Sequence, residues 1–451
     1  MVHQFKNNGY DIVLDVTSGA IHVVDDVTYD VIAMCEEHTK EEILAALSDK
    51  YSEAEIKEAM DEVEQLRENE ELFTEDVYEN HIIDFKKRPT VVKALCLHIA
   101  HDCNLACKYC FAEEGEYHGR RALMSYETGK QALDFLIANS GNRRNLEVDF
   151  FGGEPLLNFD VVKQLVAYGR EQEKLHDKHF RFTLTTNGVL LNDDIMEFAN
   201  KEMDNVVLSI DGRKEVHDHM RPFRKGAGSY DLIVPKFQKL ADSRNQERYY
   251  VRGTFTHYNT DFSKDVLHLA DLGFKQISVE PVVAQPTDDY ALTEEDLPVL
   301  FEEYDKLAAE MVRRNKEGNA FNFFHFMIDL EGGPCVYKRL SGCGSGTEYL
   351  AVTPWGDLYP CHQFVGNEDF LMGNVWDGIK RNDIQDEFKC CNVYAKEKCR
   401  NCFARFYCSG GCAANSYNFH GSITDAYDLG CELQKKRIEC AIMIKAAEAE
   451  N

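Results

Sequence analysis

The sequence has little positive charge and no long apolar run. There are 50 Lys and Arg residues against 78 Asp and Glu, so the formal net charge is −28 and the pI is near 5.0. Because binding to a phosphate backbone requires a basic face, we expect no nucleic-acid partner. No apolar stretch is long enough to cross a bilayer, and the polar start MVHQFKNNGYD differs from a signal peptide. We expect a cytoplasmic protein with no membrane partner.

Cysteine is absent from one long stretch, between Phe111 and Pro334, although the chain has 16 cysteines. Five precede this gap and eleven follow it. Such a density in a reducing compartment indicates metal or redox chemistry rather than disulfides. Uneven clustering is typical of metal sites. Cys35 and Cys96 lie alone in apolar stretches, and we expect them to be packed in cores.

Residues 1–85 have the pattern of a small separate unit. YDIVLDV (10–16) and GAIHVVD (19–25) alternate apolar and polar residues around a TSG turn, as short strands do. Apolar residues then recur at helical spacing in three stretches, 26–38, 40–51 and 53–70. Two strands followed by three helices predict a winged-helix-like module, and FKKRPTVV after it has the character of a linker.

From residue 93 onward, apolar strands alternate with helical stretches. The predicted strands are KALCLHIA, LEVDFFGG, FRFTLTTNG, NVVLSIDG, YYVRGTFTHY and KQISVEPV. Six strand–helix units predict an α/β fold in which a parallel sheet forms a partial (β/α)6 barrel with helices outside. Functional loops of such barrels lie at the carboxyl ends of the strands. We therefore expect this domain over residues 93–316, and a cysteine-rich remainder over 317–451.

The first of these strands runs directly into three cysteines. Cys103, Cys107 and Cys110 are spaced C-x3-C-x2-C, with Tyr109 before the last. Structural zinc sites and ordinary four-iron clusters take four protein ligands, so three leave one corner open. The segment resembles the signature of the radical S-adenosylmethionine (SAM) enzymes. The resemblance implies a catalytic [4Fe-4S] cluster that binds SAM and cleaves it to a 5′-deoxyadenosyl radical. The alternative is a zinc knuckle with a distant fourth ligand.

Motifs at the ends of the next strands resemble the SAM-binding segments of the same family. In FFGGEP, Gly152 and Gly153 let the backbone approach a ligand. The resemblance implies that Glu154 accepts the SAM amino group, since a carboxylate suits an ammonium. It places five more residues near the ribose and carboxylate of SAM: Thr186, Asn187, Ser209, Asp211 and Arg221. The alternative for each motif is a turn or a helix cap.

The C-terminal cysteines follow a second spacing pattern. Cys343 is followed by twelve residues, Gly356, four residues and Cys361, and C-x2-C-x5-C-x3-C then precedes Cys431. The pattern resembles the seven-cysteine SPASM extension of radical SAM peptide maturases. It implies two auxiliary [4Fe-4S] clusters, three clusters in all. The second auxiliary cluster would be held by Cys399, Cys402, Cys408 and Cys431, and the first by Cys343, Cys361 and Cys412.

The first auxiliary cluster is therefore one ligand short. Sulfatase-maturing relatives have an eighth cysteine shortly after the first, whereas GSGTEYLAVTPWG after Cys343 has none. Either Cys335 supplies the fourth ligand or the corner is open. We favour the open corner, because a substrate thiolate bound there would be deprotonated and held in place.

The N-terminal pattern, ahead of such an enzyme, resembles the RiPP recognition element. This PqqD-like module captures the leader of a ribosomal peptide as an extra strand. Taken together, the chain is most similar to the SCIFF-peptide maturases, which are sactisynthase-like. The resemblance implies thioether formation between a Cys sulfur and a carbon of an acceptor residue in a cysteine-rich precursor peptide. It also implies SAM as co-substrate and an electron donor such as flavodoxin or ferredoxin.

Two alternatives remain at this stage. One is another SPASM reaction, such as formylglycine formation or a carbon–carbon crosslink. The other is a non-enzymatic iron–sulfur or zinc protein, for example an electron carrier, which the GGEP motif at the predicted barrel mouth opposes.

Overall fold

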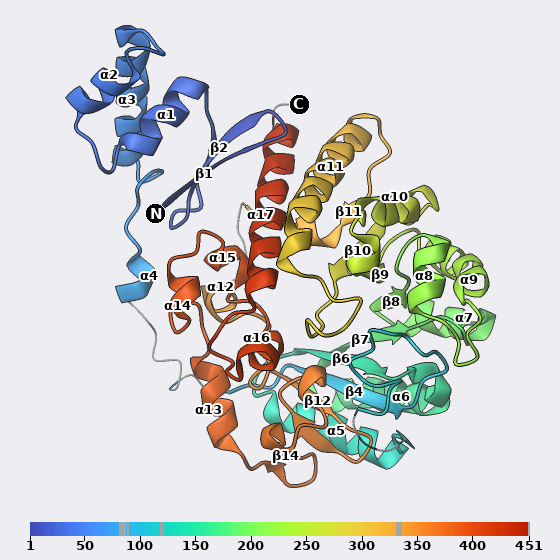
Figure 1. The fold of residues 1–451 in the computed structure, drawn as a ribbon. Helices are drawn as coiled ribbons and strands as arrows, with labels where there is room; N and C mark the ends of the chain where they lie inside the picture. Colours follow the sequence, from blue (N-terminus) through green and yellow to red (C-terminus); the bar gives the residue numbers. More distant parts are fainter. Residues whose placement is uncertain (81–86, 88–89, 118, 120, 331–335, 450–451) are drawn as a thin grey trace.

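The computed structural model describes residues 1–80, 87, 90–117, 119, 121–330 and 336–449 (Figure 1). Cys335, the predicted domain boundary at residue 85 and part of the predicted linker lie outside these residues. In the described part of the chain, no helix is long and apolar enough to cross a membrane.

The N-terminal unit is an antiparallel sheet followed by helices. The sheet has the order β1 (Val2–Asn7), β2 (Tyr10–Asp15), β3 (Ile21–Val23). The helices are α1 (Asp26–Met34), α2 (Lys40–Leu47), α3 (Glu53–Glu68) and the short α4 (Val77–Asn80). Capping boxes begin α2 and α3, which satisfies backbone N–H groups at both helix starts. The sequence predicts β2, β3 and three helices but not β1, whose residues VHQFKN are mostly polar.

Alternation along the sheet explains how this unit packs. Ile12 and Leu14 of β2, with Phe5 of β1, belong to the main hydrophobic core of the molecule. Val13, which points to the other face, belongs to a separate core formed with the helices. The sheet therefore docks on the rest of the chain, and the helices project away from it (Figure 1).

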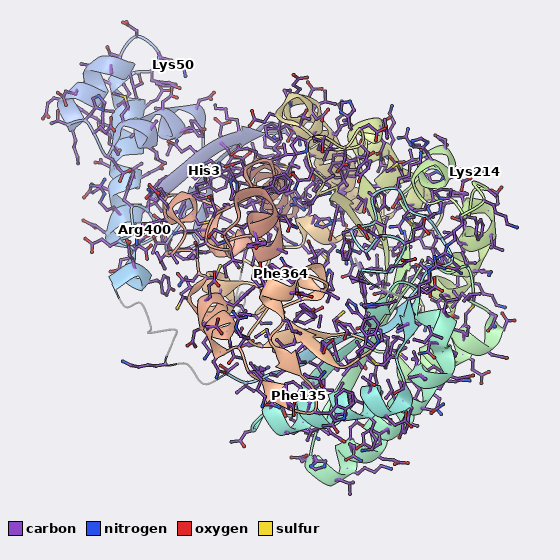
Figure 2. All side chains as sticks on the ribbon, turned by 60° about the horizontal axis from the view of Figure 1, so that its bottom comes forward. His3, Lys50, Phe135, Lys214, Phe364 and Arg400 are labelled. Carbon is purple, nitrogen blue, oxygen red and sulfur yellow. The ribbon has the colours of Figure 1, made fainter. Side chains whose placement is uncertain are left out.

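Polar contacts fix the same junction. The Nε2 atom of His3 lies 2.9 Å from Oε1 of Glu439, and the His3 ring stacks on Phe403 with centroids 3.5 Å apart. Figure 2 shows His3 at this junction and Lys50 at the far end of the unit. Asp76, which follows α3, accepts a hydrogen bond from Nη2 of Arg405 at 2.7 Å. The Arg405 side chain is only 4% exposed, so this ion pair is largely buried.

Six parallel strands in sequential order form the centre of the molecule. They are β4 (Ala94–His101), β6 (Asn145–Gly152), β7 (His179–Thr186), β8 (Asn205–Ser209), β9 (Tyr249–Phe255) and β10 (Gln276–Pro281). Every residue of β4 is buried, as expected for a strand covered on both faces. The predicted alternation of strands and helices is confirmed. In the described part of the chain β4 and β10 do not pair with each other, and the sheet continues beyond them to β12 and β11.

Helices lie outside this sheet (Figure 1). They are α5 (Tyr126–Asn139), α6 (Phe159–His176), α7 (Asp193–Glu202), α8 (Lys214–Met220), α9 (Tyr230–Ser243), α10 (Ser263–Asp271) and α11 (Leu297–Lys316). Two short strands, β5 (Ala122–Leu123) and β11 (Asn322–Phe323), pair with β4 and β10.

The C-terminal region extends the same sheet. β12 (Tyr349–Val352) pairs in parallel with β4, and antiparallel strands follow: β13 (Asp357–Tyr359), β14 (Gly373–Asn374) and β15 (Gly378–Ile379). The helices are α12 (Val336–Ser341), α13 (Asn382–Cys390), α14 (Glu397–Arg400), α15 (Arg405–Cys408), α16 (Ala413–His420) and α17 (Asp428–Ala449). α17 begins three residues before its predicted start and lies along α11 (Figure 1).

Candidate functional site

Three cysteines occupy the loop that follows β4. The loop is held by backbone bonds to the end of α8 and the residues after it: Lys108 donates to Met220 O, and Ala106 to Pro222 O, both at 2.9 Å. Burial, with smaller contributions from Glu154, Cys107 and Cys110, raises the pKa of the Cys103 thiol to about 12. The structure thus brings the three predicted ligands together.

The two glycines of GGEP meet this loop rather than open space. A Cβ atom on Gly152 would lie 2.4 Å from Ala100 O, and one on Gly153 would lie 2.1 Å from Asp102 O. Gly153 also donates its N–H to Ala100 O at 2.7 Å. The sequence predicts that these glycines let the backbone approach a ligand. In the structure the close approach is to the chain that carries the cysteines.

Glu154 is buried directly beyond these glycines. Oε1 accepts hydrogen bonds from Leu156 N at 3.0 Å and the Thr186 hydroxyl at 2.8 Å, and Oε2 accepts one from Asn187 N at 2.8 Å. A carboxylate offers about four acceptor positions, so one is left for a further donor. Burial raises the pKa of Glu154 to about 7 despite these bonds. An ammonium group bound here would favour the ionised form.

Asn187 connects the end of β7 to the cysteine loop. Its Nδ2 donates to Asn104 Oδ1 at 2.7 Å and lies 3.6 Å from Cys103 Sγ. Nδ2 of Asn104 is itself buried without a hydrogen-bond partner among the described residues. A buried, unpaired amide is costly, and an acceptor atom of a ligand would satisfy it. The sequence interpretation missed Asn104, which carries no signal beyond its place between two ligands.

Asp211, at the end of β8, is fully buried beneath the same loop. It accepts hydrogen bonds from the Tyr109 hydroxyl at 2.7 Å, from Arg221 Nε at 2.9 Å and from Thr254 N at 3.0 Å. The Arg221 guanidinium lies 5.2 Å from the centre of the Tyr109 ring. Asp211, Tyr109 and Arg221 therefore form one connected group.

Ser209 is the last residue of β8, paired with Arg252 of β9, and is partly buried. The residues predicted to contact SAM thus lie at or just after the carboxyl ends of β4, β6, β7 and β8, except Arg221, which follows α8. A role of each in binding SAM remains a prediction.

The seven C-terminal cysteines fall into two groups. Burial raises the pKa of the Cys361 thiol to about 12, with added contributions from Cys412 and Cys343. Burial also raises the pKa of Cys431 to about 12, and the contributing thiols there are Cys408, Cys399 and Cys402. The thiols near Cys361 and those near Cys431 thus belong to the same predicted auxiliary sets, and Cys391, which belongs to neither set, lies near Cys399 as well.

The two groups differ in exposure. In the first, Cys343 and Cys412 are exposed and Cys361 is buried. In the second, Cys399 is buried and the other three are partly buried. The group with only three predicted ligands is therefore also the more accessible one among the described residues.

Among the described residues, no set of three or more His, Cys, Asp or Glu side chains is placed to hold a single metal ion. A four-iron cluster makes a different demand, because each iron takes its own thiolate and the ligands do not converge on one point. Three adjacent thiols and the unpaired amide of Asn104 fit a cluster that carries a small polar ligand.

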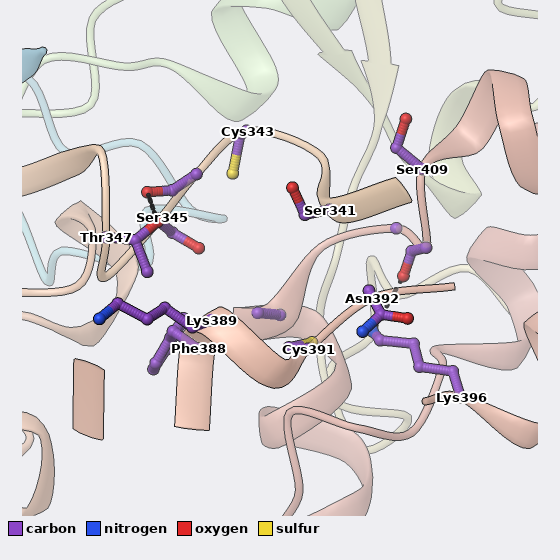
Figure 3. A pocket seen from close by; sticks show the side chains of 14 residues that line it. Ser341, Cys343, Ser345, Thr347, Phe388, Lys389, Cys391, Asn392, Lys396 and Ser409 are labelled. Carbon is purple, nitrogen blue, oxygen red and sulfur yellow. Dashed lines mark hydrogen bonds between the residues drawn. The ribbon is translucent and has the colours of Figure 1, made fainter. Parts of the chain in front are cut away.

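The other cysteines vary in their surroundings. Cys96 and Cys440 are buried and Cys35 is half-buried, which agrees with packing roles. Cys391 lines a cavity with Cys343 and Lys396 (Figure 3). His98 and His101, which flank the loop, are buried with Nδ1 and Nε2 3.0 Å apart, and burial lowers the pKa of His101 to about 4.

Comparison with known proteins bears on this arrangement. Residues 97–270 match the Radical SAM superfamily. The chain is 24% identical over 379 residues to the radical SAM cyclopropyl synthase TigE of Paramaledivibacter caminithermalis, covering 76% of this chain and 72% of TigE. It is 24% identical over 359 residues to the cysteine-type anaerobic sulfatase-maturating enzyme of Clostridium novyi, covering 75% and 92%.

Solved structures show the same fold. The enzyme anSMEcpe with bound AdoMet superposes with a TM-score of 0.67 at 20% identity, over 80% of this chain and 96% of that one. Streptococcus suis SuiB bound to its precursor peptide SuiA superposes with a TM-score of 0.50 at 15% identity, over 95% and 98%. The chain therefore contains a radical SAM domain and has homologues among the maturases of the SPASM type.

Proposed function

We propose that this protein is a radical SAM maturase that installs thioether crosslinks in a cysteine-rich, ribosomally synthesised peptide. Residues 93–316 would form the SAM-cleaving barrel, residues 317–451 would hold two auxiliary clusters, and residues 1–85 would bind the leader of the peptide. SAM would be consumed to methionine and 5′-deoxyadenosine.

One observation carries the proposal. Ten cysteines form the three predicted sets of three, three and four, and in the second set, which has three predicted ligands, Cys343 and Cys412 are exposed. An exposed group with a free position suits the thiol of an incoming peptide, because a metal-bound thiol is deprotonated and fixed.

The chain's own residues would prepare the reaction. Glu154 would bind the amino group of SAM, and Asn104 and Asn187 would position polar atoms of SAM beside Cys103. When bound, the cluster on Cys103, Cys107 and Cys110 supplies the electron that cleaves SAM. In the net reaction a C–S bond replaces a C–H and an S–H bond. The hydrogen atom goes to the 5′-deoxyadenosyl radical, the thiol proton to solvent, and the remaining electron to an auxiliary site.

The N-terminal sheet supports the leader-binding part of the proposal. β1 contacts α17, whereas β3 has no further strand beside it in the part of the chain that is described. SuiB, solved with its precursor peptide, matches 95% of this chain. Because residues 1–80 are more than a twentieth of the 451, that match includes part of the N-terminal unit. A leader strand would add to the open edge of β3.

A second candidate function is another SPASM reaction, favoured by the similarity to a sulfatase-maturating enzyme and to a cyclopropyl synthase. The product decides between them. A thioether removes two hydrogens from the peptide and blocks a cysteine towards alkylation. Formylglycine formation eliminates the side-chain sulfur, and a carbon–carbon link leaves every cysteine free to be alkylated.

The test is an anaerobic iron and sulfide count on the reconstituted full chain, with 5′-deoxyadenosine measured alongside. About twelve irons are expected for three four-iron clusters. The triple variant Cys103→Ala, Cys107→Ala, Cys110→Ala should lose about four irons and all 5′-deoxyadenosine. Peptide products are then examined by mass spectrometry after alkylation. Zinc in place of iron, or 5′-deoxyadenosine from the triple variant, would contradict the proposal.

A further inference from the structure

Lys396 is a buried cation at the start of α14. The residue is 2% exposed, and its Nζ donates to Gly410 O at 2.9 Å. In the described structure no carboxylate lies within ion-pair distance of this Nζ, whereas nearby Lys398 pairs with Asp428 at 2.6 Å. A buried ammonium without an anionic partner is strongly unfavourable. Negative charge from another source would therefore stabilise this site.

The position of Lys396 indicates that source. Gly410, which accepts its hydrogen bond, lies two residues after Cys408 and two residues before Cys412. Cys408 belongs to one auxiliary group and Cys412 to the other. The methylene carbons of Lys396 also pack near Gly410, so the side chain is fixed against the loop that joins the two groups.

A cavity of about 40 Å³ brings further thiols to the same place. Figure 3 shows Cys343 on one side of it, and Cys391 and Lys396 on the other. Cys399, which belongs to the other group, donates its backbone N–H to Lys396 O at 3.0 Å. Lys396 therefore lies beside residues of both groups.

We infer that Lys396 is a positioning residue whose ammonium is the shared counter-ion of both auxiliary clusters and raises their reduction potentials. This inference rests on the proposed function, since it requires that both groups hold clusters. Reduction adds one negative charge to a cluster, and a nearby buried cation stabilises the reduced form more than the oxidised form. In this way Lys396 would favour transfer of the electron that is left after C–S bond formation from the peptide to an auxiliary site.

The experiment uses the full chain in the background Cys103→Ala, Cys107→Ala, Cys110→Ala, so that only auxiliary clusters contribute. Redox titrations with dithionite are followed by electron paramagnetic resonance. Lys396→Met removes the charge and replaces the lysine by an unbranched side chain that is one atom shorter. Lys396→Arg keeps the charge. Lys398→Met is the matched control. It removes a charge from the same segment, but the Lys398 side chain is 49% exposed.

We expect Lys396→Met to shift the auxiliary potentials to more negative values, and Lys396→Arg and Lys398→Met to leave them near the parent values. Loss of iron from the Met variant but not from the Arg variant would also support a counter-ion. Unchanged potentials in Lys396→Met at full iron content would overturn the inference, as would an equal shift in Lys398→Met or iron loss in both Lys396 variants. About eight irons in the parent show that the two auxiliary clusters required by the proposed function are present, whatever the effect of Lys396, and their absence would refute both.

Discussion

Arg221 donates from Nε to Oδ1 of Asp211 at 2.9 Å, and its Nη1 lies 3.8 Å from Cys107 Sγ. Both side chains are buried or nearly so. The family resemblance implies that Arg221 lies near the carboxylate of SAM, and this remains a prediction. In the structure the pair with Asp211 joins the end of β8 to the cysteine loop and so helps to hold the loop in place.

The first prediction concerns this pair. Asp211→Asn leaves the Arg221 charge uncompensated, and breaking a buried pair costs about 3–5 kcal/mol. We expect the iron content of the site formed by Cys103, Cys107 and Cys110 to fall. Formation of 5′-deoxyadenosine should decrease at least about tenfold. Asp261→Asn is the control, because Asp261 pairs with Arg213 at 2.7 Å in a more exposed place. Full activity of Asp211→Asn would show that the loop does not depend on the pair.

The second prediction concerns pH. The pKa of Glu154 is raised to about 7 by burial, so the ionised form that binds an ammonium gains population as pH rises through about 7. SAM binding should therefore strengthen over this range. Thr186→Val removes a donor that stabilises the ionised form and should move the midpoint to higher pH. Glu154→Gln should remove the dependence, which isothermal titration of SAM at a series of pH values would detect. A wild-type profile as flat as that of Glu154→Gln would exclude this role.

The third prediction concerns the edge of β3. Val24 N donates to Asp11 O, and Asp15 N donates to Ala20 O. In an antiparallel pair every second residue bonds to the neighbouring strand, so Val23, which precedes Val24, points its N–H away from β2. Val23→Pro removes that outward N–H while keeping the bonds to β2. We expect weaker peptide binding and slower peptide modification, with unchanged SAM cleavage in the absence of peptide.

Val23→Thr is the control for this test, since it keeps the N–H at a side chain that is 46% exposed. Peptide turnover is followed by mass spectrometry and SAM cleavage by chromatography. Equal peptide turnover in Val23→Pro and Val23→Thr would argue against an added strand at this edge.

The fourth prediction concerns the ion pair between Asp76 and Arg405. The Tyr394 hydroxyl also donates to Asp76 at 2.9 Å, so Asp76→Asn disturbs two buried partners. We expect the C-terminal region to lose about 3–5 kcal/mol of stability. Both tryptophans lie in this region, and their fluorescence during urea unfolding measures the change. Glu79→Gln breaks a more exposed pair with Arg400 and should cost under about 1 kcal/mol.

The fold was largely readable from periodicity, and the exceptions have physical causes. Six apolar strands separated by helical stretches predict the order of the central sheet, because each buried strand is a continuous apolar run. β1 was missed since a strand that pairs at an edge can be mostly polar, and only Phe5 and Asn7 of it are buried. Its stability comes from β2 and α17, which no local pattern contains.

The candidate site, too, was predictable from the sequence only in part. Cysteine spacing predicts which thiols gather, because those ligands are close in the chain or follow a known pattern. Spacing does not reveal which neighbours bond to them. Lys396, in YAKEKC, has the sequence environment of a surface lysine, and only the packing of Gly410 and the cysteines around it shows that it is buried.

The two auxiliary groups are interleaved along the chain. Cys343 and Cys361 come first, then Cys399, Cys402 and Cys408 of the other group, then Cys412 and finally Cys431. Each cluster would act as a cross-link whose loop contains ligands of the other, so formation of either shortens the loop that the other must close. Iron loading of the two groups should then be cooperative, and loss of one cluster should loosen the second. The two clusters together should therefore stabilise this region more than the sum of their separate effects.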